Sequence, residues 1–584
     1  MPGGNKLIPA DQLAAIALSL TRDHVPLLME AYLRPGELPN QRLNGLLALL
    51  YVSHLFPEFE DMTAVRKQAG EALESYLATA FHADGGMLEQ SLNYNLGDLE
   101  KLRQIRQLVA VDPPPWLPLL TSRIQGFLLM LEAIRTPAGE LPIIGNNDSN
   151  PPALWTGAAV RESWFTRKTK ENPQGGRPSL APASCAFPFS GYYAQRSGGD
   201  WDGKYLFFTN ARPATGHHSM DNLAIEVHAF GRPLLVRGGP PFYSPKFLAP
   251  DLRRDERSIE EYIGEGSSFK LNSVIVDGLP QCRSGAPAEV AYEAPITARW
   301  HSSEEFDYVE GRYDLGYGVA KPGAIARGDR SVSHFRRVFF VRRLGVWLIS
   351  DTMAATDERP HSYSRIWKFP PRFDGPASGH APAFGFRDED VVIDGRGIHT
   401  ADPSGPNLWI IEAGSAPLAR QKLFGQRQPY RGWHARYLGD LIPAVDVHSG
   451  WMATGTSTQL AVLWPRPDAK PPPIIRTSQP QLSEDDTAAA TTLTLTGNAW
   501  ISFADGGGGV ASDSVPGLTC TARAFVAVSH ASEDVHGLVM DGQLVEKHSG
   551  RTHEAPSGSF EFQARRGSIV MVQPIRRTET FSWR

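Results

Sequence analysis

This 584-residue chain has few cysteines, a small net charge and no long apolar run. Its three cysteines, Cys185, Cys282 and Cys520, lie far apart, with neither metal-ligand nor redox spacing. The net charge of -5 and the pI near 6.4 predict no nucleic-acid partner, because such partners need a basic surface. No apolar run reaches the roughly 18 residues of a membrane span, so we expect no membrane segment.

The pattern of apolar residues predicts helices first and strands later. Apolar residues recur at helical spacing from about residue 10 to residue 135. Beyond residue 164, short runs rich in Val, Ile, Phe and Tyr predict strands, among them 204–208, 223–227, 338–341 and 346–349. We therefore predict an α+β multidomain chain, divided into an α-helical bundle or incomplete α/α toroid at 1–165, a linker at 166–188, a large antiparallel β-sandwich at 189–465 and a small β domain at 466–584.

The most informative stretch is residues 216–243, which read GHHSMDNLAIEVHAFGRPLLVRGGPPFY. Three polar residues, His217, His218 and Asp221, precede two apolar runs that a bend joins, and this pattern predicts a β-hairpin. Imidazoles beside buried strands would have the fixed orientation that acid–base catalysis requires. Taken alone, the same histidines also fit an ordinary surface loop.

Two earlier stretches are rich in hydrogen-bonding side chains. Residues 84–95, DGGMLEQSLNYN, stand at the entrance to a predicted helix, where asparagines are also ordinary capping residues. Residues 141–150, LPIIGNNDSN, form a predicted turn that carries several amides. Both stretches could therefore supply polar contacts to a ligand.

Together these stretches resemble the heparinase II/III-like polysaccharide lyases. The family's Gly-His-x-His-x-Asp motif and the strands that follow it are similar to residues 216–243, and its Asp-Gly-x-x-x-Glu-Gln-Ser-x-x-Tyr motif is similar to residues 84–94. The 141–150 turn, the strand at 271–278 and the hairpin at 334–351 also look like family segments, in the family's order. The resemblance implies an α/α toroid followed by a β-sandwich, although relatives carry more helix before the first of these motifs.

The resemblance also implies the residues of an active site. We predict three catalytic residues: Asn95 would contact the carboxylate of the substrate, His217 would be the base or charge neutraliser, and Tyr243 would be the acid. Family members often carry a catalytic Tyr near the 141–150 turn, and none occurs there, so Tyr94, Tyr243 and His217 stay open as proton carriers. The other expected substrate contacts are Gln90, Asn93, Tyr94, Asn147, Asn150, His218 and Arg237.

Family members that hold zinc take ligands from three positions that read Ser219, Arg237 and Leu271 here. A hydroxyl, a guanidinium and an isobutyl group do not form the nitrogen and carboxylate shell that zinc prefers. We therefore predict no metal and no cofactor. Arg237 is expected to replace the positive charge of the ion and to pair with Asp221.

The function that this resemblance implies is β-elimination in an acidic, uronate-containing polysaccharide. A non-catalytic carbohydrate-binding relative is the first alternative, because the turn Tyr and the zinc ligands are missing. A glycoside hydrolase on a helical toroid is the second, because hydrolases use two facing carboxylates. Its candidate carboxylates are Asp84, Glu89, Asp98 and Asp148.

The expected partner is an acidic polysaccharide or oligosaccharide, with no nucleic acid and no membrane. A homo-oligomer in which a partner subunit closes the site is one way to complete a short toroid. The first residues, MPGGNKLIPADQL, lack the basic and apolar regions of a signal peptide. Because a signal can be removed from a mature chain, we still expect a periplasmic or secreted protein.

Overall fold

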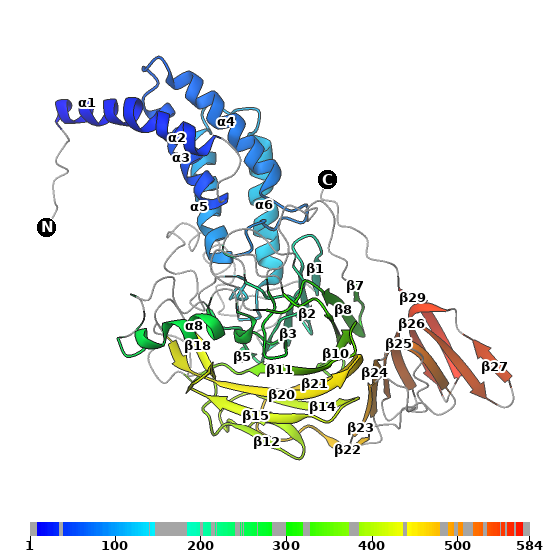
Figure 1. The fold of residues 1–584 in the computed structure, drawn as a ribbon. Coiled ribbons are helices and arrows are strands. Elements are labelled where there is room, and N and C mark those ends of the chain that lie inside the picture. The colour runs from blue at the N-terminus through cyan, green and yellow to red at the C-terminus, as the bar shows by residue number, and fades with distance from the viewer. Residues whose placement is uncertain are drawn as a thin grey trace.

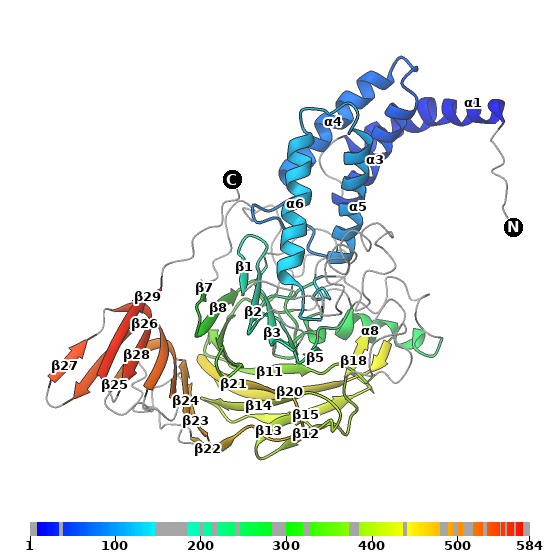
Figure 2. The ribbon, with the colours of Figure 1, turned by 180° about the vertical axis from the view of Figure 1, so that it is seen from behind.

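Helices come first in this computed structural model and antiparallel sheets follow (Figure 1), which confirms the predicted fold class. The view from behind shows the same helices rising from one side of the sheets (Figure 2). The structure describes residues 9–33, 39–138, 140–145, 184–198, 202–211, 217, 219–239, 246, 248, 250–264, 267–282, 299–318, 328–372, 385–435, 441–478, 489–495, 500–505, 518–529, 534–548, 551–554, 557–565 and 568–575.

The helices of the N-terminal region pack through apolar stripes, as their residue spacing predicts. They are α1 (Ala10–Leu18), the π-helical η1 (Ser19–His24), α2 (Val25–Tyr32), α3 (Pro39–Leu55), α4 (Met62–Thr79), α5 (Leu92–Leu108) and α6 (Leu117–Ile134). Leu46, Leu73 and Leu99 are buried in the shared core. Leu13 and Ile16 are exposed, because α1 extends beyond the other helices (Figure 1).

Helix α6 is long and apolar enough to cross a membrane, by length and composition alone. The expectation of no membrane segment rests on the lack of an uninterrupted apolar run, and Arg123 and Glu132 interrupt the run in this helix. Ile124, Phe127 and Leu131 of this helix are buried in the core that the helices share with the first sheet. An apolar helix packed in this way is typical of a protein core.

The first sheet contains the predicted hairpin. Its five strands run in chain order: β1 (Cys185–Phe187), β2 (Tyr192–Arg196), β3 (Tyr205–Thr209), β4 (Ile225–Ala229) and β5 (Arg232–Leu235). Phe230 (φ 54°) and Gly231 (φ 74°) form the turn between the last two strands, in the two-residue geometry of tight hairpins. Strand β1 pairs with β2, so the sheet begins inside the predicted 166–188 linker, whose prolines masked so short a strand.

Two further sheets complete the sandwich, and buried side chains such as Tyr193, Trp347 and Trp367 fill the space between them and the first sheet. An eight-stranded sheet has, in spatial order, β12 (Val391–Asp394), β13 (Gly397–Thr400), β14 (Asn407–Gly414), β21 (Thr456–Arg466), β10 (Val346–Ala355), β9 (Val332–Val341), β8 (Phe306–Tyr313) and β7 (Arg299–Ser302). A four-stranded sheet has β15 (Ala419–Phe424), β20 (Val445–Thr454), β11 (Pro360–Lys368) and β6 (Val274–Val276).

Short elements cover one end of the sandwich. They are η3 (Arg253–Asp255), α8 (Glu256–Ile263), η4 (Ser268–Lys270), and the strand pairs β16 (Gln426–Arg427) with β17 (Tyr430–Arg431) and β18 (Trp433–Ala435) with β19 (Leu441–Pro443). Tyr430 and Trp433 are buried with Leu248 and Ile259 in a small core of their own. These elements therefore form a separately packed cap.

The C-terminal sheet packs on the outer face of the eight-stranded sheet. Its strands are β22 (Ile474–Ser478), β23 (Ala489–Leu495), β24 (Trp500–Asp505), β25 (Leu518–Ser529), β26 (Asp534–His548), β28 (Gly558–Arg565) and β29 (Ser568–Pro574), with β27 (Arg551–Glu554) paired to β26. The rings of Phe339 and Phe503 lie 5.5 Å apart between the two sheets. A shared apolar core thus joins the C-terminal sheet to the sandwich.

Asp84 joins the helical region to the first sheet. Its carboxylate accepts hydrogen bonds from the backbone N–H groups of Phe189 (2.8 Å) and Ser190 (2.9 Å) and from the Ser190 hydroxyl (2.6 Å). Gly86 is needed beside it, because a Cβ there would lie 1.9 Å from the Ser190 hydroxyl oxygen. Asp84 is buried, so these bonds replace the water that the carboxylate loses.

We expect Asp84→Ala to lower the free energy of unfolding by about 2–4 kcal/mol, because it leaves three donors, two of them on buried Ser190, without an acceptor. Urea denaturation measures the loss. Asp314→Ala is the matched control, because Asp314 pairs with Arg312 at the surface and its removal should change little. Equal losses in the two variants would contradict a joining role for Asp84.

Candidate active site

A histidine of the sandwich meets a carboxylate of the helical region. His217 Nδ1 lies 2.7 Å from Glu89 Oε1, and the Glu89 side chain is fully buried while that of His217 is 22% exposed. The Tyr94 ring stacks on the imidazole, with the ring centres 3.6 Å apart and the planes at 8°. His217 is therefore held on two sides by residues that are 128 and 123 positions away in the chain.

Helix α5 begins beside this pair and positions it. The side-chain amide nitrogen of Asn95 donates to the Glu89 carbonyl at 2.7 Å. Asn95 is only 2% exposed, so this donor is used inside the protein, and the direct substrate contact predicted for it is not supported by the position of its side chain. Asn93 and Tyr94 are half-buried in the first turn of the same helix, whereas Gln90 is buried.

The turn that follows α6 packs against the backbone of Gln90, next to Glu89, and against the backbone of His217. Gly145 has a φ of 66°, and a Cβ there would lie 2.0 Å from the Gln90 carbonyl oxygen and 2.8 Å from that of His217. Only glycine combines this backbone conformation with so close an approach. The structure thus brings three of the five stretches that carry the family resemblance into contact.

Arg237 anchors this turn to the sandwich and is itself 1% exposed. Its guanidinium donates to Asp221 Oδ2 (3.0 Å), to the Thr209 hydroxyl (2.9 Å) and to the Ala224 carbonyl (2.9 Å). The pairing with Asp221 is the one predicted from the sequence. Burial raises the pKa of Asp221, and the Arg237 guanidinium acts in the opposite direction. This side chain therefore cross-links three segments of the first sheet.

Arg237 and Glu226 both form hydrogen bonds with the backbone of Ile143. The guanidinium donates to the Ile143 carbonyl at 3.3 Å, while Glu226 Oε1 accepts from the Ile143 N–H at 2.8 Å. Glu226 Oε1 also lies 3.4 Å from Arg237 Nε. Two charged side chains of the hairpin thus fix the turn that ends at Gly145.

The three positions that hold zinc in some relatives do not fit a metal ion here. The buried guanidinium of Arg237 takes one of them, with Nη1 and Nη2 already hydrogen-bonded, and Leu271 puts a buried apolar side chain at another. Ser219, at the third, offers a hydroxyl, which is a weak zinc ligand. Among the residues that the structure describes, no group of three or more His, Cys, Asp or Glu side chains could hold a metal ion.

Four of the predicted site residues lie outside the described residues. They are Asn147, Asn150, His218 and Tyr243. The predicted residues that the structure does describe near His217 are Gln90, Asn93, Tyr94 and Asn95, with Arg237 holding the adjoining turn.

Three carboxylates of the hydrolase alternative, Asp84, Glu89 and Asp98, are buried, and each already has a partner within the protein. Asp84 is bonded to the first sheet, and Glu89 is bonded to the imidazole. Burial raises the pKa of Asp98 to about 6, and the Lys101 ammonium group, 2.8 Å away, acts in the opposite direction. Asp148 lies outside the described residues.

Sequence reasoning missed Glu89 and Glu226 as parts of this arrangement. Glu89 entered only as a hydrolase candidate, and Glu226 was counted within a strand. A signal was present for Glu226, because an acidic residue in an apolar stretch becomes buried and must find a cation or a donor, whereas the polar stretch around Glu89 carries no such signal. The sequence did not reveal which partner each would find.

Known proteins share this architecture. Residues 180–461 match the family model described as "Heparinase II/III-like, C-terminal". The heparan sulfate lyase HepC from Pedobacter heparinus is 17% identical, with a TM-score of 0.57 over 83% of this chain and 68% of that chain. Two heparinase III structures are 14% and 15% identical, each with a TM-score of 0.60, over 85% and 84% of this chain and 70% and 71% of theirs. No curated protein matches the chain by sequence.

Replacing Arg237 tests the anchoring of the turn. We expect Arg237→Met to lower the free energy of unfolding by about 3–5 kcal/mol, because it leaves buried Asp221 and Glu226 without a cation. Arg237→Lys should lose less, since one ammonium group keeps the charge but cannot make the forked contacts of a guanidinium. Chemical denaturation measures both losses, and a Met variant as stable as the parent would contradict this role.

Proposed function

We propose that this chain, whose residues 180–461 form a heparinase II/III-like domain, is a polysaccharide lyase that cuts an acidic, uronate-containing polysaccharide by metal-independent β-elimination. The observation that carries the proposal is the bond between Glu89 and His217, which fixes an imidazole where the helical region meets the sandwich. The similarity to a heparan sulfate lyase and to two heparinases supports the substrate class.

The reaction demands proton transfer and stabilisation of charge from such a site. A base removes the proton at C5 of the uronate, and the electron pair of that bond forms the C4–C5 double bond. The glycosidic O4 leaves with its bonding pair and takes a proton from an acid. Because the C5 proton is weakly acidic, stabilising the negative charge that builds up on the carboxylate is the larger demand.

His217 is the base in this proposal. An ionised carboxylate can only accept hydrogen bonds, so the Nδ1 that faces Glu89 carries the hydrogen and Nε2 carries the lone pair. Nε2 takes the C5 proton, and the carboxylate of Glu89 then offsets the positive charge of the imidazolium. The stacked Tyr94 ring holds the imidazole plane in the same orientation throughout.

The side-chain amides of Asn93 and Asn95, in the first turn of α5, have different roles in this proposal. Asn93 is the more exposed of the two and is suited to donate to the substrate carboxylate. Asn95 is a positioning residue, since its amide nitrogen holds the backbone of Glu89. Tyr243 is the proposed acid that protonates O4, and no metal ion takes part in either step.

His217→Ala should reduce kcat on a cleavable polyuronide by about 10²–10⁴-fold, because it removes the base. Glu89→Gln should lower kcat by about 100-fold with little change in KM, because the neutral amide no longer fixes the tautomer or balances the imidazolium. The assay follows the ultraviolet absorbance of the unsaturated product over a panel of heparan sulfate, hyaluronan, alginate, glucuronan and ulvan.

Arg359→Gln is a suitable control for this assay, because Arg359 pairs with Asp329 and Asp357 at the exposed surface. Full activity of His217→Ala would overturn the assignment of the base. Binding of a polyuronide by the parent protein without any rise in absorbance would favour a non-catalytic carbohydrate-binding relative instead.

Tyr94 provides a separate test of the proton carrier. Tyr94→Phe keeps the ring that stacks on His217 and removes only the hydroxyl, so kcat should change less than about threefold. Tyr94→Leu removes the stack and should lower kcat at least tenfold. A tenfold change corresponds to an increase of roughly 1.4 kcal/mol in the activation free energy. A Phe variant as inactive as His217→Ala would instead make the Tyr94 hydroxyl the proton carrier.

A further inference from the structure

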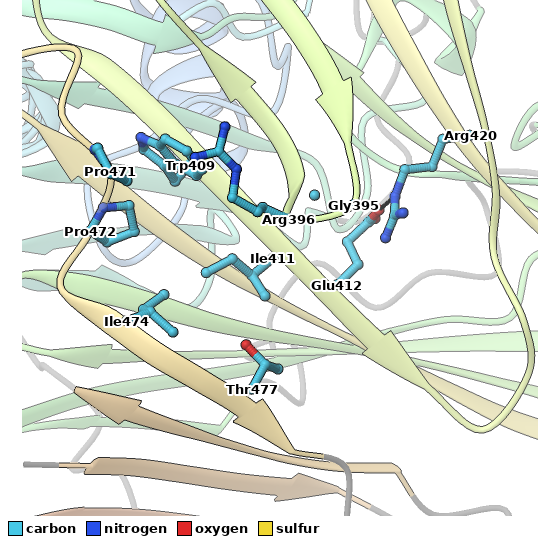
Figure 3. A pocket seen from close by; sticks show the side chains of 11 residues that line it. Gly395, Arg396, Trp409, Ile411, Glu412, Arg420, Pro471, Pro472, Ile474 and Thr477 are labelled. Carbon is cyan, nitrogen blue, oxygen red and sulfur yellow. Dashed lines mark hydrogen bonds and ion pairs between the residues drawn. The ribbon is translucent and has the colours of Figure 1, made fainter.

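A second cavity lies on the sandwich, well away from the Glu89–His217 pair. Figure 3 shows it between the β12–β13 hairpin, strand β14, Arg420 of β15 and the segment that leads into β22. Its volume is about 350 Å³, which is near the lower end of the range for small-molecule sites. Strands β12, β14 and β22 are on the side of the sandwich away from the helices (Figure 1).

Apolar side chains form part of the wall of this cavity. Ile411 faces Ile474 and Pro472 across it (Figure 3). Trp409 also lines the cavity, but the His399 ring stacks on the indole at 4.1 Å and the Arg396 guanidinium lies 5.0 Å from its centre. The indole thus already has two side chains packed on it, and a ligand ring would lie against the aliphatic side chains.

A chain of buried charges ends in the same cavity. Arg336 pairs with Asp351, Asp351 with Arg365, Arg365 with Glu412, and Glu412 with Arg420, at separations of 2.6–3.5 Å. His334 beside Asp351 does not add to the charge, because burial lowers its pKa. Three guanidinium groups and two carboxylates leave one net positive charge.

Arg420 is where this excess charge can meet a ligand. Its side chain is 23% exposed, whereas those of Arg336 and Arg365 are fully or almost fully buried. Arg396, across the cavity, is neutralised by Asp394 at 2.8 Å, so it adds hydrogen-bond donors rather than net charge. Glu412 also lines the cavity and pairs with Arg420 at 2.8 Å, so the excess charge belongs to the whole chain of charges and Arg420 is its exposed end. A cavity with an aliphatic wall and this exposed guanidinium suits a ring that carries one anionic group.

We propose that this cavity binds one acidic sugar unit of the polymer, with the anionic group on Arg420 and the ring against Ile411 and Ile474. The inference rests on the proposed function for the class of ligand. A long chain that is held here and at His217 together would gain avidity, because the second contact becomes intramolecular.

Two substitutions test the cavity in different ways. Arg420→Gln removes the exposed guanidinium at the end of the charge chain, while Glu412 keeps its bonds to Trp367 and Ser449. Gly395→Phe fills the cavity, since a Cβ at Gly395 meets nothing within 4 Å and its φ lies outside the left-handed range. Arg359→Gln serves as the control, because Arg359 is an exposed arginine paired with two carboxylates elsewhere.

Binding is measured by calorimetry in a His217→Ala background, so that the probe is not consumed. The probes are tetrasaccharides from heparan sulfate and from alginate, a neutral cellulose tetrasaccharide, and inorganic sulfate. An acidic tetrasaccharide should bind at this cavity as well as near His217. Arg420→Gln should weaken that binding step about tenfold, Gly395→Phe should abolish it, and Arg359→Gln should leave it unchanged. Unaltered melting temperatures confirm that the variants are folded.

Three results would overturn the proposal. The first is a titration that neither cavity variant changes, even if the parent protein cuts polymer. The second is equal binding of the neutral tetrasaccharide at this cavity, which would remove the role of charge. The third is equally tight binding of inorganic sulfate, which would make it a site for free anions. If no polymer is cut but both variants lose an acidic-sugar binding step, the proposed reaction fails and the cavity assignment stands.

Discussion

The hydrogen bond between Glu89 and His217 is the contact on which the site depends. Glu89 is buried at the start of α5, and a buried carboxylate needs a donor. The helical region offers the carboxylate and the sandwich offers the imidazole, so neither group is satisfied until the two regions are packed together. The same bond that stabilises this junction also fixes the orientation that acid–base chemistry requires.

The need to pair buried charges explains the surrounding residues as well. Arg237 takes up Asp221 and Glu226, and these side chains in turn hold Ile143. The turn held in this way ends at Gly145, which packs against the backbone carbonyl of His217. A guanidinium can therefore provide a rigid cross-link, because it supplies a positive charge and several directed hydrogen bonds.

The periodic and local parts of the fold could be predicted from the sequence. Apolar spacing predicted the helices, and two apolar runs joined by a bend at Phe230 and Gly231 predicted the β4–β5 hairpin. Strand β4 begins at Ile225 rather than at 223, because Leu223 adopts a left-handed φ of 60° that a strand cannot continue. Local pattern does not reveal such a reversal when the residue is a leucine.

Contacts between distant segments were predicted only where the resemblance named both partners. The pairing of Arg237 with Asp221 was predicted because the two residues occupy known motif positions 16 apart. The partner of Glu89 was not, since it lies 128 positions away and only packing decides which donor arrives. The charge chain that ends at Arg420 was missed for the same reason, because its members come from five different strands.

The most direct test of elimination at this site is digestion of a uronate polysaccharide in water enriched in heavy oxygen, followed by mass spectrometry of the products. Elimination takes no oxygen from water, so the account predicts unsaturated products without heavy oxygen. Products that carry one heavy oxygen atom per cut would show hydrolysis and would contradict it.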